Sequence, residues 1–158
     1  MRNGSQIQCL SDALSFRVSR FAAINEHLGS KHFRDEFGLS LSEWRVLGLV
    51  QESDPATTAS VRATLLMDRG FLSRVVKGLR TRGLLISQTS ATDKRQTELL
   101  LTVEGKELHQ AGMVFTRERN QAMASALKPS EQAEFGGMLD MLIAANAKRL
   151  TTKDSADE

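Results

Sequence analysis

The amino-acid sequence predicts a mainly α-helical fold with one small β-hairpin. Over most of the 158 residues, apolar side chains return at the three-to-four-residue spacing of amphipathic helices. Only two prolines interrupt the chain. One stretch departs from this pattern, because the apolar runs 84–86 and 99–101 flank a polar tip that carries Asp93, Lys94 and Arg95. We interpret this stretch as two antiparallel strands joined by a charged turn.

The composition favours one soluble domain, or one domain with an oligomerisation element. Apolar residues make up 41% of the chain and charged residues 25%, both ordinary for a globular protein. No apolar run is long enough for a membrane span, and residues 1–10 lack the apolar core of a signal peptide. A single cysteine, Cys9, excludes a disulfide framework within the chain. We therefore expect a cytoplasmic protein that does not associate with membranes.

The first helix is expected over residues 7–28, where large apolar side chains recur at helical spacing. Gly29 and Ser30 weaken the pattern, so this helix should falter there. Phe33 and Phe37 indicate a further short helical piece. The residues that mark the first stretch are Leu10, Leu14, Val18, Phe21, Ile24 and Leu28.

A second helix is expected after Ser40, because Ser40 and Glu43 occupy the two positions of a capping box. An apolar stripe then follows at helical spacing and predicts a buried face. Pro55 ends the helix, since the residue before a proline disfavours helical backbone. The stripe consists of Trp44, Leu47 and Val50.

Two short helices joined by a tight turn are expected next. Thr57 or Thr58 can cap the first of them, which runs to about Met67. Asp68 is suited to cap the second, and Gly83 stands where a glycine commonly ends a helix. This is a helix-turn-helix arrangement. The inward side chains of its second helix are Leu72, Val75 or Val76, and Leu79.

Two further helices are expected after the hairpin. The first runs from Thr102 to Leu127, where Lys128-Pro129 interrupts it. The second carries an apolar side, and residues 151–158 are expected to form a polar tail. That apolar side consists of Phe135, Met138, Leu139, Leu142 and Ile143.

Positive charge is concentrated on the helix-turn-helix and the hairpin. The formal net charge of the chain is only +2, yet eight basic and two acidic residues lie between positions 61 and 95. Such focusing is typical of a surface that binds phosphates. The alternative is a helix face whose charges contact only solvent.

Three stretches of the sequence carry a more specific pattern. The first is residues 39–47, Leu-Ser-Leu-Ser-Glu-Trp-Arg-Val-Leu, and the second is residues 72–84, which include Ser73-Arg74-Val75-Val76. The third is the wing pattern Asp93-Lys94-Arg95, followed by Leu101-Thr102 and Gly105. Together they resemble the MarR (multiple antibiotic resistance regulator) family of winged helix-turn-helix transcription factors, and the resemblance covers roughly residues 10–147.

The resemblance implies a homodimer that regulates transcription, most often as a repressor. Residues 1–38 and 103–150 would form a helical dimerisation region, and residues 39–102 a winged helix-turn-helix lobe that binds DNA. Expected partners are a pseudo-palindromic double-stranded DNA operator and a small aromatic or lipophilic effector that modulates DNA binding. An alternative is a winged helix used for protein contacts or for non-specific DNA binding, without an effector.

Seven side chains are predicted to form the DNA-binding site. Arginine can pair with a guanine edge, whereas lysine and serine can hold phosphates. Arg95 is expected to enter the minor groove, and Asp93 to accept hydrogen bonds that fix the turn around it. The seven are Arg69, Ser73, Arg74 and Lys77 on the second helix of the helix-turn-helix, and Asp93, Lys94 and Arg95 in the wing.

The resemblance also places an effector cavity among the first, second and fifth helices. Its aromatic candidates could equally belong to the core. Its arginines, with Arg45, could supply a cation for a carboxylate effector or could equally be surface charges. The predicted lining is Phe16, Arg17, Arg20, Trp44 and Phe115.

No enzymatic activity, cofactor or metal is expected. The three histidines, His27, His32 and His109, lack the spacing of a ligand set, and no nucleophile–histidine constellation or phosphate-binding loop occurs. Peroxide-sensing relatives surround an N-terminal cysteine with tyrosines, and this chain has no tyrosine. We therefore interpret Cys9 as a thiol without a sensing role.

Overall fold

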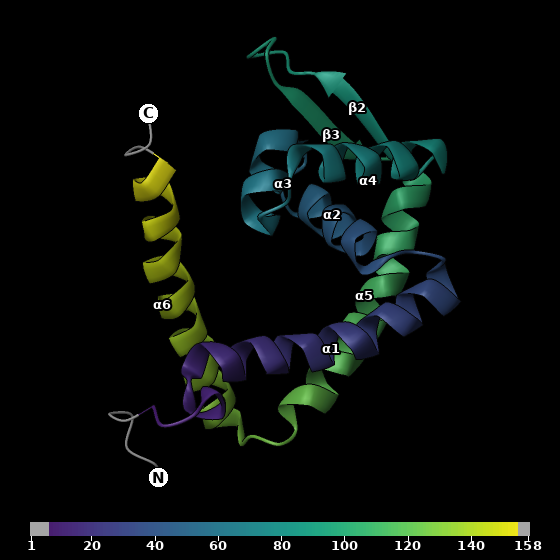
Figure 1. Ribbon diagram of the computed structural model, residues 1–158. Coiled ribbons are helices and arrows are strands. Elements are labelled where there is room, and N and C mark those ends of the chain that lie inside the picture. The colour runs from purple at the N-terminus through teal and green to yellow at the C-terminus, as the bar shows by residue number, and fades with distance from the viewer. Residues whose placement is uncertain (1–6, 155–158) are drawn as a thin grey trace. The chain divides into compact units, whose positions relative to one another are not determined.

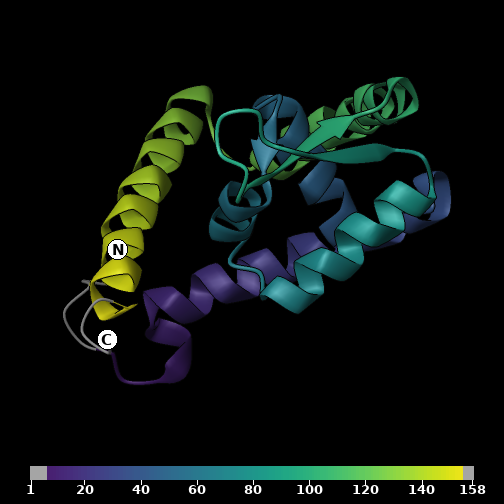
Figure 2. The same ribbon diagram turned by 90° about the horizontal axis from the view of Figure 1, so that it is seen from above.

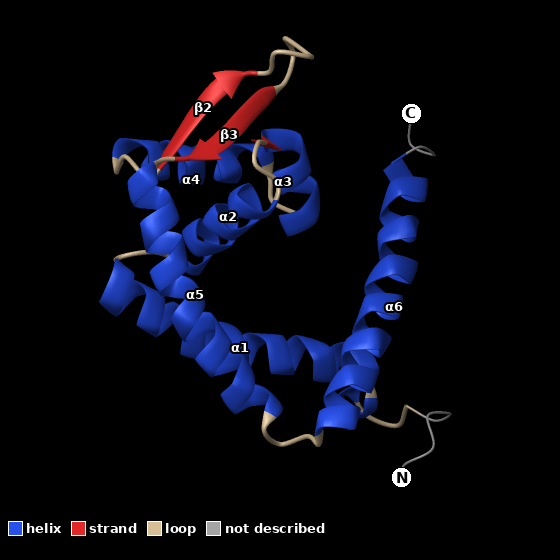
Figure 3. Cartoon of the chain, turned by 180° about the vertical axis from the view of Figure 1, so that it is seen from behind, coloured by secondary structure: helices blue, strands red, loops and turns tan. Residues whose placement is uncertain are grey.

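The computed structural model describes residues 7–154. The chain divides into two compact units, residues 1–113 and 114–158. Helices dominate, and the described strands form one small sheet within the first unit (Figure 3). The predicted fold class, mainly α with a hairpin wing on a helix-turn-helix, is confirmed. Within residues 7–154, no helix combines the length and apolar character needed to cross a membrane.

The first long helix, α1 (Leu14–Phe37), differs from the expected one at both ends. A short 3-10 helix, η1 (Leu10–Asp12), occupies the predicted start. The helix then continues through Gly29 and Ser30, because Gly29 is buried and Phe33 packs in the core at 1% exposure. Burial of this face outweighs the weak helix propensity of the glycine. Gly38 ends α1 in a left-handed conformation, with φ of 59°.

The second helix, α2 (Leu41–Glu52), begins with the predicted capping box. The backbone N–H of Glu43 donates to Ser40 Oγ at 3.2 Å, and the Ser40 N–H donates to Glu43 Oε2 at 2.7 Å. The predicted stripe is buried, and Val46 joins it. This helix packs against α1, the helix-turn-helix and the sheet, so it forms the centre of the first unit.

The helix-turn-helix consists of α3 (Thr58–Leu65) and α4 (Arg69–Thr81). Thr57 caps α3, and Leu66 ends it with a left-handed φ of 51°. Asp68 caps α4 by accepting a hydrogen bond of 2.6 Å from the Phe71 N–H. Leu72, Val75 and Leu79 are buried, and Gly83 follows the helix with φ of 70°, as predicted.

The wing is a hairpin of β2 (Leu85–Thr89) and β3 (Thr97–Leu101). Register pairs Leu85 with Leu101 and Thr89 with Thr97, and the hairpin tip projects beyond α3 and α4 (Figure 1). A two-residue strand, β1 (Ala56–Thr57), pairs with the other edge of β3. The sequence did not predict β1, because two residues are too few to show alternation.

The helix α5 (Val103–Ala124) starts directly after the hairpin and continues into the second unit. Its first turn lies against Leu84, where a side chain on Gly105 would overlap the Leu84 carbonyl oxygen. One face of Gly112 is covered by the Trp44 ring, which lies 2.5 Å from where a Cβ atom would stand. Both glycines therefore permit close contact between the start of α5 and the winged lobe (residues 39–102).

The second unit contains the end of α5 and the helix α6 (Pro129–Asp154). Pro129 opens α6, as its position after the predicted interruption requires. The predicted polar tail starts too early, because α6 continues through residues 151–154. The remainder, residues 155–158, lies outside the described residues.

Candidate nucleic-acid interface

A groove of about 670 Å³ separates the helix-turn-helix from the hairpin. Figure 2 gives a view from above, in which α4 runs beside the hairpin. Four basic side chains, and no acidic one, line this groove within the described part of the chain. We call it the basic groove. Its polar lining is Thr58 and Arg62 from α3, Arg69, Ser73, Lys77 and Arg80 from α4, and Ser87 and Thr97 from the hairpin.

Three predicted DNA contacts, Arg69, Ser73 and Lys77, share this groove. They stand four residues apart on α4, so they lie on one side of the helix. Asp68 fixes the start of α4, which determines where this side faces. The capped first turn also leaves backbone N–H groups and a positive helix end near the groove.

Two groove residues, Arg62 and Arg80, were not assigned to the site from the sequence, although both lie in the basic segment. Arg80 follows Lys77 by three positions, so the helical period could have placed it on the same side. Arg62 comes from α3, and only the packing of α3 beside α4 and the hairpin brings it to the groove. No local pattern could have identified it.

The predicted contact Arg74 does not line the basic groove. Its guanidinium carbon lies 5.8 Å from the centre of the Phe71 ring, an arrangement suited to a cation–π contact. One guanidinium nitrogen lies near Gly70, in the first turn of α4. Arg74 therefore extends along the exposed surface towards the helix start, the end that contacts base edges in helix-turn-helix proteins.

The wing tip is closed by hydrogen bonds centred on Asp93. Its carboxylate accepts from the backbone N–H of Arg95 and from the side-chain amide of Gln96, each at 3.0 Å. These bonds, the backbone bond first, lower the pKa of Asp93 below its ordinary value. Asp93 thus supports the backbone of the turn, while Lys94 and Arg95 are exposed at the tip.

A second residue, Ser90, stabilises the base of this tip and was missed from the sequence. It is buried, and its Oγ lies within hydrogen-bonding distance of Thr92 Oγ1, at 3.1 Å. Its backbone N–H donates to the Gln96 carbonyl at 3.0 Å, which closes the loop. The exposed basic side chains are therefore carried on an ordered turn.

The predicted effector-pocket residues range from buried to exposed. Trp44 is only 8% exposed and stacks between Phe33 and His109, with ring centres 4.6 Å and 5.3 Å away. It is a core residue of the first unit. Phe16 is half-buried and Arg20 exposed, whereas the half-buried Phe115 belongs to the second unit.

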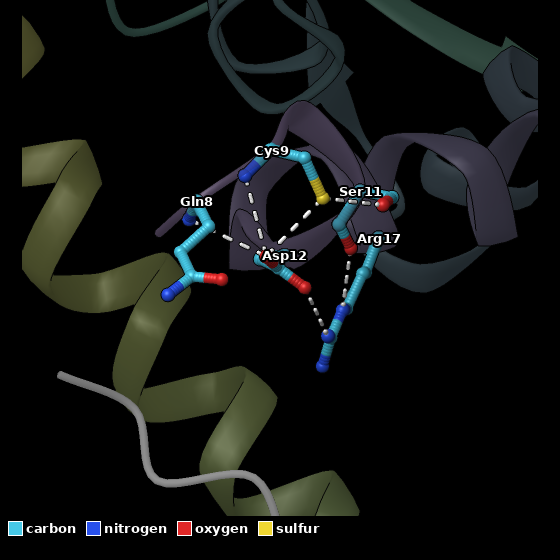
Figure 4. A network of polar contacts seen from close by, with 5 residues as sticks. All are labelled: Gln8, Cys9, Ser11, Asp12 and Arg17. Atoms are coloured by element: carbon cyan, nitrogen blue, oxygen red, sulfur yellow. Dashed lines mark hydrogen bonds and ion pairs between the residues drawn. The ribbon is translucent and has the colours of Figure 1, made fainter. Parts of the chain in front are cut away.

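The remaining pocket candidate, Arg17, is bound within the start of α1 (Figure 4). Its Nε donates to the Ser11 carbonyl at 2.9 Å, and its Nη2 lies 3.8 Å from the Asp12 carboxylate. Arg45 forms an ion pair of 2.8 Å with Glu26. That Arg17, Arg20 or Arg45 supplies a cation for an effector carboxylate remains a prediction.

Cys9 belongs to the same network. Its thiol donates to Asp12 Oδ2 at 3.2 Å and lies 3.0 Å from Ser11 Oγ (Figure 4). The thiol contact is the main cause that lowers the pKa of Asp12. These contacts give Cys9 a local structural role at the turn before α1.

The comparisons with known proteins agree with this geometry. Residues 37–96, from the end of α1 to the wing tip, match the family model described as the MarR family. No curated protein sequence matches the chain. Solved structures do match it over most of their length and of its own.

A probable transcriptional regulator from Pseudomonas aeruginosa is 26% identical, with a TM-score of 0.73, and the match covers 85% of this chain and 100% of that one. The PcaV transcriptional regulator from Streptomyces coelicolor, solved with its natural ligand, is 23% identical, with a TM-score of 0.74 and coverage of 89% and 99%. A SlyA-like transcription regulator from Listeria monocytogenes shares the fold at 19% identity, with a TM-score of 0.79 and coverage of 94% and 96%. Residues 37–96 thus resemble the MarR family, and most of the chain shares the fold of these transcriptional regulators.

Proposed function

We propose that this chain is a homodimeric regulator, acting as a repressor, that binds a pseudo-palindromic operator and responds to a small aromatic or lipophilic molecule. The basic groove carries the DNA-binding part of the proposal. It combines four cations from two helices with hydroxyl groups from the hairpin. A surface of this composition suits phosphate oxygens.

In the proposed binding mode, one sugar–phosphate strand of the DNA lies across the basic groove. If α4 enters a major groove and Arg95 the neighbouring minor groove, one sugar–phosphate strand separates the two. That strand passes between helix and wing, across the basic groove. Arg62, Lys77 and Arg80 then neutralise phosphates. Arg74, which lies outside the groove, is the candidate for contact with base edges.

Exposed apolar faces support the homodimer. Within α1, large side chains that mark the predicted amphipathic face are exposed, among them Leu14 at 59%. On α6, Met138, Met141 and Leu142 lie on one side of the helix at spacings of three and four residues, and Met141 is 73% exposed. Such surfaces are unfavourable in water and are typical of protein interfaces. We assign them to contact with a second copy, with residues 1–38 and 103–150 as the dimerisation region.

The effector part of the proposal is supported by the match of residues 37–96 to the MarR family model and by the PcaV structure, which was solved in complex with its natural ligand. We propose that Phe16, Arg17 and Arg20 of the first unit line the effector site, with Trp44 supporting it from the core. An effector that prefers one arrangement of the two lobes shifts the dimer population towards that arrangement. DNA is released if the preferred arrangement no longer matches two successive major grooves.

The direct test uses the protein's own promoter region. Fluorescence anisotropy would compare its affinity for that duplex and for a scrambled duplex of equal length at physiological salt. We expect clearly tighter binding to the promoter duplex, since base contacts add to the phosphate contacts. Equal affinity for the two duplexes would contradict a sequence-specific regulator.

A further inference from the structure

One basic residue of the helix-turn-helix segment, Arg82, binds the backbone of another helix. It caps α4, and its guanidinium group donates to two backbone carbonyls at the end of α1. Nη1 lies 2.9 Å from the Gly38 oxygen, and Nη2 lies 3.1 Å from the Phe37 oxygen. Carbonyls at a helix C-terminus lack partners within the helix and carry partial negative charge. The planar guanidinium can bind two of them at once.

This contact joins α1 and α4 directly. Both α1 and α4 pack against α2, which occupies the centre of the first unit. Arg82 connects the end of α1 directly with the end of α4. It therefore adds a direct constraint on the position of the α4 C-terminus relative to α1.

The next two residues, Gly83 and Leu84, accept hydrogen bonds from Thr102, the residue before α5. Thr102 Oγ1 donates to the Gly83 carbonyl at 2.7 Å, and the Thr102 N–H donates to the Leu84 carbonyl at 3.3 Å. Gly105 allows α5 to approach the Leu84 carbonyl closely. Three consecutive residues after α4 thus connect it with α1 through Arg82 and with α5 through Gly83 and Leu84.

We propose that Arg82 is a positioning residue, which sets the spacing of the two operator half-sites that the dimer accepts. The inference rests on the proposed function, in which the exposed apolar face of α1 contacts a second copy. Because Arg82 fixes α4 relative to α1, it also fixes the separation of the two α4 helices in the dimer. Its charge is used within the protein and does not add a phosphate contact.

The test measures spacing preference rather than affinity alone. The dimer is titrated with an inverted repeat carrying its preferred spacer, and with repeats whose spacer is one base pair longer or shorter, a shift of about 3.4 Å. The preference ratio is the affinity for the best spacer divided by that for the altered spacers. For Arg82→Ala we expect this ratio to fall by roughly fivefold or more, the lower end of typical coupling between sites.

Arg80→Ala is the matched control, because it removes one positive charge from the same end of α4. It should weaken binding to every spacer by the same factor and leave the ratio unchanged. Thermal unfolding establishes that each variant is folded. If Arg82→Ala does not fold, Arg82→Gln replaces it, since the neutral side chain cannot reproduce the two-pronged contact, and the same fall in the ratio is expected.

The outcomes separate this inference from the proposed function. If the wild-type protein shows no preference for an inverted repeat, the proposed function fails. If the wild type has a spacing preference and a folded Arg82 variant keeps the same ratio, the positioning role is overturned. A uniform fall in affinity with an unchanged ratio would likewise overturn it and identify Arg82 as a residue that binds phosphate.

Discussion

Four cationic side chains line the basic groove, and they come from two different helices. Arg69, Lys77 and Arg80 share one helix, whereas Arg62 comes from the neighbouring helix. A strand that crosses the groove would meet all four. Each lysine or arginine that neutralises a phosphate releases condensed counterions, so the salt dependence of binding reports how many phosphates are neutralised.

Arg62→Ala should lower DNA affinity equally for all sequences. The slope of log affinity against log salt concentration should become shallower by about 0.9 for each phosphate that the variant no longer neutralises. Arg45→Ala is the control, because it removes the same charge at an exposed ion pair with Glu26. An Arg62 variant with the wild-type slope would exclude Arg62 from the interface.

Arg74→Ala should instead change sequence preference. A bidentate contact between arginine and guanine contributes roughly 1–3 kcal/mol of discrimination against the wrong base. The measurement is affinity for an operator series with every single base-pair change, and the variant should lose its preference at one position per half-site. If Arg74→Ala weakens binding to the whole series by one factor, Arg74 contacts only phosphates.

The hydrogen bonds to the Asp93 carboxylate predict that the stability of the wing depends on pH. Hydrogen bonds from Arg95 and Gln96 lower its pKa below the ordinary value of 3.8, so the ionised carboxylate stabilises the folded turn. This contribution is fully present above that value and is lost as the pH falls through the lowered pKa. The difference in unfolding free energy between the wild type and Asp93→Asn should therefore shrink in acid. A difference that stays constant from about pH 7 to about pH 2 would contradict the assignment.

At the scale of elements, helix ends were predictable because their signals are local. Ser40 with Glu43, Asp68 and Gly83 each act within four residues of their own position, and all three ends appear as expected. The continuation of α1 through Gly29 was not predictable, since it depends on burial against distant residues. The strand β1 and the position of Arg62 in the basic groove were not predictable either, because both depend on the packing of other elements beside them.

Two glycines test the packing of these elements. Gly105→Ala would place a methyl group on the Leu84 carbonyl oxygen, so we expect destabilisation by about 1–3 kcal/mol. Gly48→Ala is the matched change in α2, where a Cβ atom meets nothing within 4 Å. It should stabilise the fold by about 0.5–1 kcal/mol, because alanine favours helix over glycine. Chemical denaturation measures both, and equal effects would mean that α5 does not approach Leu84 as closely as described.

At the scale of the whole molecule, the proposed two-fold dimer would cover the exposed apolar faces of α1 and α6. The sequence predicted the fold class, and it located the basic residues of α4 and the wing, because periodicity and charge are visible in one chain. It could not show that Arg74 lies outside the groove or that Arg82 binds α1. Both depend on which way a long side chain turns in three dimensions.

Above all, we propose that two copies of the chain bind one inverted repeat in DNA. Selection of bound sequences from a random duplex library, followed by sequencing and by measurement of chains per duplex, tests it most directly. The account predicts enrichment of an inverted repeat whose half-site centres lie about 10–10.5 base pairs, or one helical turn, apart, with two chains on each duplex. Enriched sequences without two-fold symmetry, or no enrichment over the starting library, would contradict it.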